Sequence, residues 1–275
     1  MNTTVTRTLS GILFLAVMIC GLLLHAYFYG ALMAALLLGL LWEFFRMNMG
    51  ERHRVPRIFA MFTGLSLFVG VFCVYAFGIP HKFIGLSAFF LLALMISTLL
   101  EKDLSPFRDT AILYSGLLYL AIPLALSNLV VFRGGSFDGT LMLAFFIIIW
   151  ASDVGAYCFG MLFGQKGGKK LFPSISPKKS WAGFWGGLLM AVVASGILYW
   201  TGLFNFPLWH CLVLSVVMNV AGVYGDLFES QWKRSCGVKD SSQLIPGHGG
   251  LMDRFDSALF AIPAGFVYLA LFGLV

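Results

Sequence analysis

The sequence predicts an all-α membrane protein of about nine transmembrane helices, with the N-terminus in the cytoplasm and the C-terminus outside. Of its 275 residues, 60% are hydrophobic and only 11% are charged, whereas a soluble domain carries about 25% charged residues. The apolar residues form long runs, and the basic residues gather on one side of the predicted membrane. These observations together give the fold class and the orientation.

Nine apolar segments have roughly the 20 residues that a helix needs to cross the hydrocarbon layer. The first two are separated by one turn at His25–Ala26 and could instead form a single span. The nine predicted spans are Leu9–Leu24, Tyr27–Phe45, Ile58–Phe77, Phe83–Leu100, Ile112–Phe132, Leu141–Phe163, Trp181–Thr201, Leu208–Gln231 and Phe255–Leu274.

Sixteen of the eighteen Lys and Arg residues fall on one side of this nine-span arrangement, and only Lys82 and Arg133 fall on the other. Loops rich in Lys and Arg remain in the cytoplasm, so the sixteen mark the cytoplasmic side. If residues 9–45 form one span, only Arg7 changes sides. The charges therefore fix the orientation but not the number of spans.

The chain divides into three predicted regions. Residues 1–100 carry few charges within their spans and are expected to be a scaffold, in which Glu43 could pair with Arg46 near the membrane interface. Residues 101–138 form a middle span and its connecting loops. Residues 139–275 form the predicted catalytic region, with a site that faces the cytoplasm.

Five of the twelve acidic residues lie between residues 225 and 256, although apolar spans surround this stretch. Asp226 and Glu229 are three residues apart in one predicted helix, and Asp253 and Asp256 are three apart at the start of the next. Each pair therefore shares a helix face. Two such helices can hold a hard cation, and Mg²⁺ commonly takes one or two carboxylates together with substrate phosphates.

Asp153 lies within the apolar run Leu141–Phe163, where a carboxylate costs about 3 kcal/mol to insert. A polar site accounts for this residue better than a structural hydrogen bond does. Gly155 and Gly160 flank it and allow a neighbouring helix to approach closely.

The loop from Gly164 to Ser180 contains five lysines, three glycines and two prolines. It is predicted to be a flexible cationic lid or cradle for phosphate, because glycine lets the backbone approach an anion closely. Ser180 can cap the helix that begins at Trp181, where free N–H groups favour an anion. A solvated cytoplasmic loop would also carry these lysines and would need no ligand.

Together, the acids and bases of this region resemble the signature of the phosphatidate cytidylyltransferase family, S-x-x-K-R-x4-K-D-x4-[apolar]-P-G-H-G-G-x-x-D-R-x-D. The chain fills it without a gap from Ser230 to Asp256, and SPKKSWAG and WASDVGAY upstream resemble two further family segments. The resemblance covers residues 150–257. Ala182 replaces a common Glu or Gln, and Ser180 replaces a common Thr.

The resemblance implies an integral membrane enzyme that makes CDP-diacylglycerol and pyrophosphate from CTP and phosphatidic acid. It also implies Mg²⁺, a second cation such as K⁺, a homodimer, and a location in a bacterial inner membrane; no nucleic acid partner is expected. The family's metal-bridging aspartates correspond to Asp226 and Asp253, and its other acidic positions to Asp256 and Asp153.

The phosphate of phosphatidic acid is already an anion, so positioning and charge neutralisation are expected to matter more than a general base. The predicted catalytic residues are Asp226, Asp253, Asp256, Lys233 and Arg254. The predicted substrate-binding residues are Lys178, Lys179, Ser180, Ser230, Arg234, Lys239, Asp240, His248 and Gly249. The predicted metal ligands are Asp226, Asp253, Asp256 and Asp153.

Three other functions fit parts of the pattern. A CTP-dependent lipid or polyprenol kinase would use a similar site but transfer the γ-phosphoryl group. An ion-coupled transporter would explain the acids within the spans, although it has no use for the lysine-rich loop. A lipid-binding scaffold without activity would not need the complete set of acids.

Overall fold

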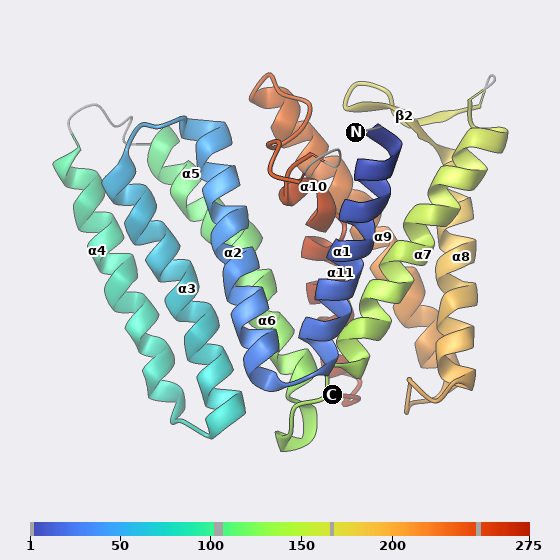
Figure 1. Ribbon diagram of the computed structural model, residues 1–275, viewed down its shortest axis with the longest axis horizontal. Helices are drawn as coiled ribbons and strands as arrows, with labels where there is room; N and C mark the ends of the chain where they lie inside the picture. Colours follow the sequence, from blue (N-terminus) through green and yellow to red (C-terminus); the bar gives the residue numbers. More distant parts are fainter. Residues whose placement is uncertain (1–2, 102–106, 166–167, 246–248) are drawn as a thin grey trace. The chain divides into compact units, whose positions relative to one another are not determined.

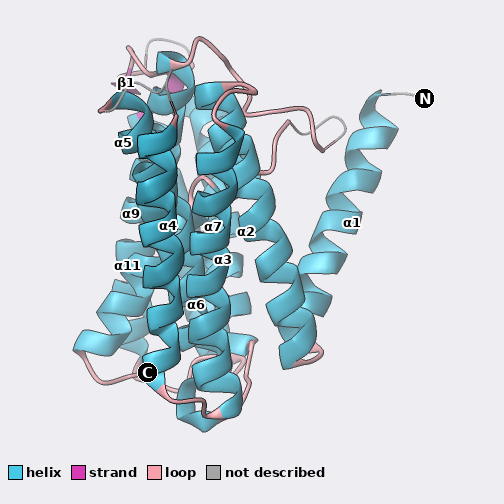
Figure 2. Cartoon of the chain, turned by 90° about the vertical axis from the view of Figure 1, so that its left-hand side faces the viewer, coloured by secondary structure: helices cyan, strands magenta, loops and turns pink. Residues whose placement is uncertain are grey.

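The computed structural model describes residues 3–101, 107–165, 168–245 and 249–275. In this part of the chain, eight helices are long and apolar enough to cross a membrane, and a shorter apolar helix covers Thr8–Leu23. Figure 2 shows helices in cyan throughout, with the described strands confined to one hairpin. The prediction of an all-α polytopic membrane protein is confirmed. The orientation of the two termini stays a prediction.

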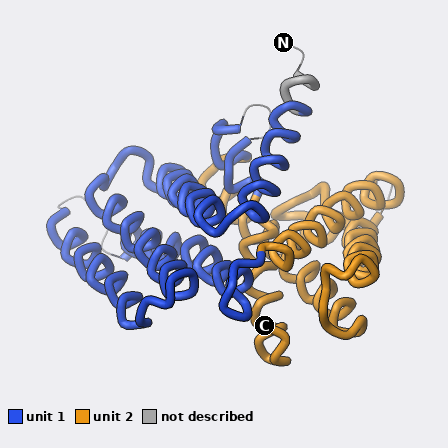
Figure 3. The backbone as a smooth tube through the Cα atoms, turned by 60° about the horizontal axis from the view of Figure 1, so that its bottom comes forward, with its two compact units in different colours: residues 1–138, 240–254 blue, residues 139–239, 255–275 orange. Residues whose placement is uncertain are grey.

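The chain forms two compact units, which are coloured separately in Figure 3. The first unit comprises Met1–Asp138 together with Asp240–Arg254. The second comprises Gly139–Lys239 together with Phe255–Val275. Most of the signature segment that follows Lys239 therefore groups with the N-terminal helices.

The helices of the first unit correspond to the first five predicted spans. Helix α3 packs against both α2 and α4, and Figure 1 shows it between them. The elements are α1 (Thr3–Leu23), α2 (Ala26–Met49), α3 (Arg54–Phe77), η1 (His81–Gly85), α4 (Leu86–Leu100), α5 (Arg108–Gly116), η2 (Leu117–Ala121), α6 (Ile122–Val131) and η3 (Arg133–Gly135).

A buried hydrogen bond and a group of aromatic rings join α2, α3 and the end of α6. The Tyr29 hydroxyl lies 2.6 Å from Ser127 Oγ, and both side chains are buried. The rings of Phe72 and Phe132 pack edge to face, with centroids 5.4 Å apart. Buried polar groups need such partners, so this contact fixes α2 against α6 without leaving an unsatisfied hydroxyl.

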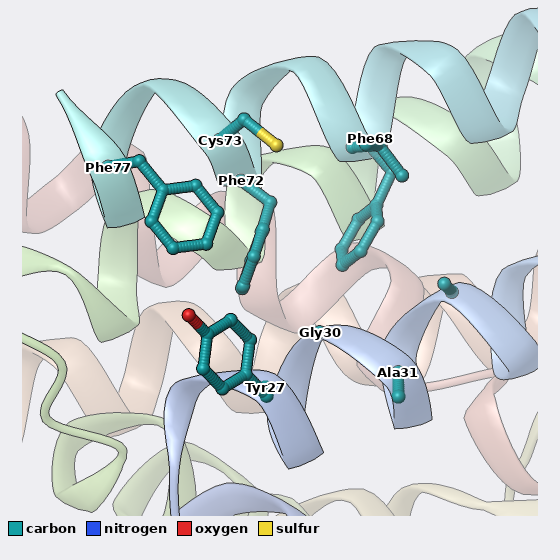
Figure 4. Close-up of a pocket in the computed structure, with 9 residues that line it drawn as sticks. Tyr27, Gly30, Ala31, Phe68, Phe72, Cys73 and Phe77 are labelled. Carbon is teal, nitrogen blue, oxygen red and sulfur yellow. The ribbon is translucent and has the colours of Figure 1, made fainter. Parts of the chain in front are cut away.

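An apolar groove of about 320 Å³ lies along α2 and α3 of the same unit. Figure 4 shows the rings of Tyr27, Phe68, Phe72 and Phe77 around it. Its lining carries no charged side chain, so it offers no counter-charge for a triphosphate.

In the second unit, α7 and α8 run side by side in Figure 1 and pack closely along a series of glycines. A Cβ on Gly155 of α7 would lie 2.5 Å from the carbonyl oxygen of Gly186 in α8. The elements are α7 (Thr140–Phe163), β1 (Lys170–Phe172), β2 (Ser176–Ser180), α8 (Trp181–Trp200), α9 (Leu208–Ser235) and α11 (Ala258–Leu271). The short helix α10 (Met252–Phe255) belongs to the first unit except for its last residue.

Two local features differ from the expectations. The lysine-rich loop contains an antiparallel hairpin, in which Lys170 pairs with Ser180 and Phe172 with Ser176. The last span is divided into α10 and α11, with a turn at Asp256 and Ser257. Both features affect how the candidate site residues are held.

Candidate active site

One face of α9 carries a row of charged and polar side chains, as the spacing predicts. Lys233 Nζ lies 3.0 Å from Glu229 Oε1, one helical turn away, and both side chains are buried. The Ser230 hydroxyl donates a hydrogen bond of 3.3 Å to Asp226 Oδ1. These contacts between residues four apart hold the acids of α9 in fixed positions.

The hairpin brings a lysine to this face. Lys179 of β2 lies with its Nζ 2.5 Å from Oδ2 of Asp226, and both side chains are partly exposed. Strand β2 pairs with β1 and leads directly into α8, so the backbone on both sides of Lys179 is fixed. The hairpin thus supplies a positioned cation where the sequence predicted only a flexible one.

The second unit also gathers its acids around Asp256. The charges of Asp226, Glu229 and Asp153 all repel that of Asp256 electrostatically. Its Oδ1 accepts a hydrogen bond of 2.6 Å from the backbone N–H of Ser257. Four acids therefore share one region: Asp153 of α7, Asp226 and Glu229 of α9, and Asp256 of the turn before α11. Such a concentration of negative charge favours a bound cation.

Ser180 caps α8, as predicted. Its hydroxyl is buried and accepts a hydrogen bond of 3.2 Å from the backbone N–H of Gly183. Lys178, two residues earlier, is exposed. The cap leaves α8 with one free backbone N–H group fewer at its start than an uncapped helix has. Lys178 and Lys179 directly precede this cap in the sequence.

Replacing Ser180 by Ala is expected to destabilise the protein by about 1 kcal/mol, because the helix loses its N-cap. Thermal unfolding of the purified protein should show a Tm lower by roughly 3 °C. Ser174→Ala, in the exposed turn between the two strands, is the matched control and should leave Tm unchanged. An unchanged Tm in the Ser180 variant would show that this hydrogen bond does not stabilise α8.

In the first unit, the structure describes residues 240–245 and 249–254 of the signature segment, named here the Asp253 loop. Asp253 Oδ2 accepts hydrogen bonds from the Ser241 N–H (3.1 Å), the Ser241 hydroxyl (3.2 Å) and the Gly250 N–H (2.8 Å). Gly249 has a φ of 85°, and a Cβ there would lie 2.8 Å from Asp253 Oδ2. Glycine is therefore required at this position by both conformation and space.

Glu43 of α2 is a buried carboxylate that contacts the same loop. The sequence suggested that Glu43 could pair with Arg46, but Arg46 Nε lies 3.3 Å from Glu51 Oε1. Glu43 instead accepts hydrogen bonds from the loop and is only 1% exposed. An acid within an apolar span was the available signal, because such a residue requires partners.

The remaining predicted residues are mostly exposed. Arg234 donates a hydrogen bond of 2.9 Å to the carbonyl of Val238 just beyond α9. Lys239, Asp240 and Arg254 are exposed, so they are accessible to a soluble ligand. His248 lies outside the described residues.

The carboxylates of the second unit provide oxygen atoms, the type of ligand that Mg²⁺ prefers. Asp226 already contacts one cationic group, the ammonium of Lys179. Within the described residues, no three His, Cys, Asp or Glu side chains are grouped to hold a metal ion by themselves. Mg²⁺ that arrives with nucleotide phosphates needs only one or two carboxylates, and Asp226 and its neighbours fit that requirement.

Comparison with known proteins gives consistent matches. A model of the cytidylyltransferase family matches residues 5–272. The phosphatidate cytidylyltransferase of Staphylococcus haemolyticus (strain JCSC1435) is 33% identical over 265 residues, or 94% of this chain and 95% of that protein. The protein of the same name from Staphylococcus saprophyticus is 37% identical over 170 residues, or 62% of this chain and 63% of that protein. The one from Staphylococcus aureus (strain COL) is 38% identical over 168 residues, or 60% of this chain and 61% of that protein.

Proposed function

This chain belongs to the cytidylyltransferase family, and we propose that it is an integral membrane phosphatidate cytidylyltransferase. It forms CDP-diacylglycerol and pyrophosphate from CTP and phosphatidate. The observation that carries the proposal is the similarity to a protein of that name over 94% of the chain. The lysines and acids on β2 and α9 support it, because a reaction between two anions requires both charges nearby.

In the proposed reaction, an oxygen of the lipid phosphate attacks the α-phosphorus of CTP. A new P–O bond forms there, the bond to the bridging oxygen of the β-phosphate breaks, and pyrophosphate leaves with the electron pair. Lys179 and Lys178 of the hairpin would bind phosphate oxygens, with Arg234 and Lys239 near the end of α9. Their task is to hold the reactants in line and offset negative charge.

Mg²⁺ is part of this proposal, and its candidate ligands in the second unit are Asp226, Asp256 and Asp153, of which one or two suffice beside nucleotide phosphates. Asp253, in the first unit, stays a ligand predicted from the sequence alone. When bound, it would offset negative charge on the triphosphate. Lys179 would then move from Asp226 to a phosphate oxygen, while Ser230 keeps the Asp226 carboxylate oriented. A second cation such as K⁺ is also proposed, and no ligand residues are assigned to it.

The same proposal includes the surroundings of the enzyme. The positive-inside rule favours a cytoplasmic site, with the N-terminus in the cytoplasm and the C-terminus outside. The bacterial relatives favour the plasma membrane. A homodimer is proposed from the resemblance of the signature segment, and chemical crosslinking of the purified protein would test it.

One assay separates the proposal from its alternatives. Purified protein is incubated with phosphatidate, Mg²⁺ and CTP labelled with ³²P at the α-phosphate, and the lipid is then extracted. The proposal requires label in the lipid and release of pyrophosphate. A CTP-dependent lipid kinase leaves the label in aqueous CDP, and a transporter or scaffold leaves it in CTP. Either of these results would contradict the proposal.

A further inference from the structure

Both carboxylate oxygens of Glu43 are occupied by the Asp253 loop. Oε1 accepts hydrogen bonds from the Ser242 hydroxyl (2.5 Å) and the Leu251 N–H (2.8 Å). Oε2 accepts hydrogen bonds from the Ser241 hydroxyl (3.0 Å) and the Met252 N–H (2.9 Å). Four donors around one buried carboxylate offset the cost of burying its charge.

These donors come from both ends of the Asp253 loop. Ser241 and Ser242 lie at its start, and Leu251 and Met252 lie at its end, next to Asp253 in the sequence. Glu43 therefore joins the two ends to each other as well as to α2. The packing is close, because a Cβ on Gly39 of α2 would lie 2.8 Å from Leu251 Cδ2, and one on Gly250 would lie 2.8 Å from Glu43 Oε2.

Ser241 connects the two carboxylates directly. Its hydroxyl lies 3.0 Å from Glu43 Oε2 and 3.2 Å from Asp253 Oδ2, so a single proton is shared between the two oxygens. The Ser241 N–H and the Gly250 N–H also donate to Asp253 Oδ2. The groups that orient Asp253 are thus the same loop residues that Glu43 holds, or their immediate neighbours.

We propose that Glu43 is a positioning residue, which fixes the Asp253 loop on α2 and thereby sets the orientation of the Asp253 carboxylate. Its consequence for catalysis rests on the proposed function, since Asp253 is a predicted catalytic residue. Glu43 itself touches the loop and does not need to touch a substrate. The N-terminal helices would then take part in the reaction through this carboxylate, instead of serving only as a scaffold.

Glu43→Gln is the principal test. The amide keeps the size of the side chain but places an NH₂ group against N–H and O–H donors, so at least one backbone N–H of the loop loses its acceptor. Hydrogen exchange of peptides that cover residues 241–254 should become at least about 10-fold faster, because the buried bonds now open locally. Exchange in α3 and α7 should remain at the wild-type rate.

The kinetic readout is kcat per folded molecule in the CTP labelling assay. Disturbing groups that orient a functional carboxylate typically costs about 10- to 100-fold, so kcat should fall by that factor while Tm changes little. Glu43→Asp, which keeps the charge, should recover part of the loss. Ser242→Ala removes only one of the four donors and should lie between wild type and Glu43→Gln in both readouts.

Glu51→Gln is the matched control, because Glu51 is an exposed acid just beyond the end of α2. It should leave both exchange and kcat unchanged. The proposal is overturned if Glu43→Gln leaves loop exchange unchanged. It is also overturned if exchange rises throughout the protein while kcat per folded molecule stays at the wild-type value. If Glu43→Gln does not fold, Glu43→Asp and Ser242→Ala decide by the same criteria.

The hydrogen-exchange measurement does not depend on the proposed activity. If the wild-type protein forms no CDP-diacylglycerol, the proposed function fails, and the exchange of residues 241–254 still decides whether Glu43 fixes the loop. If wild type is active and loop exchange in the Glu43 variants is normal, only the positioning role fails.

Discussion

Asp226→Asn is expected to lower the rate of CDP-diacylglycerol formation by at least about 100-fold, the usual loss when a group that stabilises transition-state charge is removed. The change removes the negative charge that faces Lys179 and one oxygen ligand of the proposed Mg²⁺. An amide oxygen is a weaker ligand than a carboxylate, and its NH₂ group would face the lysine ammonium. Folding should survive, because Asp226 is partly exposed.

The measurement is initial rate against Mg²⁺ concentration in the purified variant, with ³²P-labelled CTP and phosphatidate. Size-exclusion chromatography and Tm establish that the variant is folded. Glu51→Gln serves again as the acid-to-amide control and should retain wild-type activity. Full activity in Asp226→Asn would remove Asp226 from the metal site and from the reaction.

Gly155→Leu is expected to cause a large loss of stability in the second unit. A Cβ at Gly155 would lie 2.5 Å from the Gly186 carbonyl oxygen and 2.7 Å from Met190 Cγ. The first of these is backbone and cannot rotate away, so α7 and α8 must separate. Overpacking of this kind costs about 3 kcal/mol, which corresponds to a fall of roughly 10 °C in Tm.

Gly196→Leu provides the control for this change, because a Cβ at Gly196 of α8 meets no other atom within 4 Å. The two variants introduce the same side chain into the same helix pair, and only the first meets the opposing backbone. Thermal unfolding in one detergent would compare them. Equal Tm values for the two variants would mean that close contact at Gly155 does not hold α7 against α8.

The helical parts of the site could be predicted from the sequence because they depend on short-range geometry. Spacings of three and four residues place side chains on one helix face, and the contacts of Glu229 with Lys233 and of Ser230 with Asp226 confirm this on α9. The cap at Ser180 is equally local. Apolar runs of sufficient length similarly predicted the spans.

The contacts that sequence patterns did not predict are those between distant segments. Glu43 and Met252 are 209 residues apart, and no periodicity connects an acid in an early span to N–H groups in a late loop. The nearer base, Arg46, gave a plausible local partner, but it pairs with Glu51. The hairpin was missed for a different reason, because its prolines and serines are typical of turns and irregular loops.

The separation between Glu43 and its partners also affects the order in which the protein is assembled. Ser241 follows Glu43 by 198 residues, so the ribosome makes α2 well before it makes the Asp253 loop. A carboxylate without partners in a membrane span costs about 3 kcal/mol, so α2 alone is less stable in the membrane than α2 with the loop bound to Glu43. Only when the last loop emerges can the early helix dock fully. A chain that stops before this loop therefore lacks all four of the donors that surround Glu43 in the folded protein.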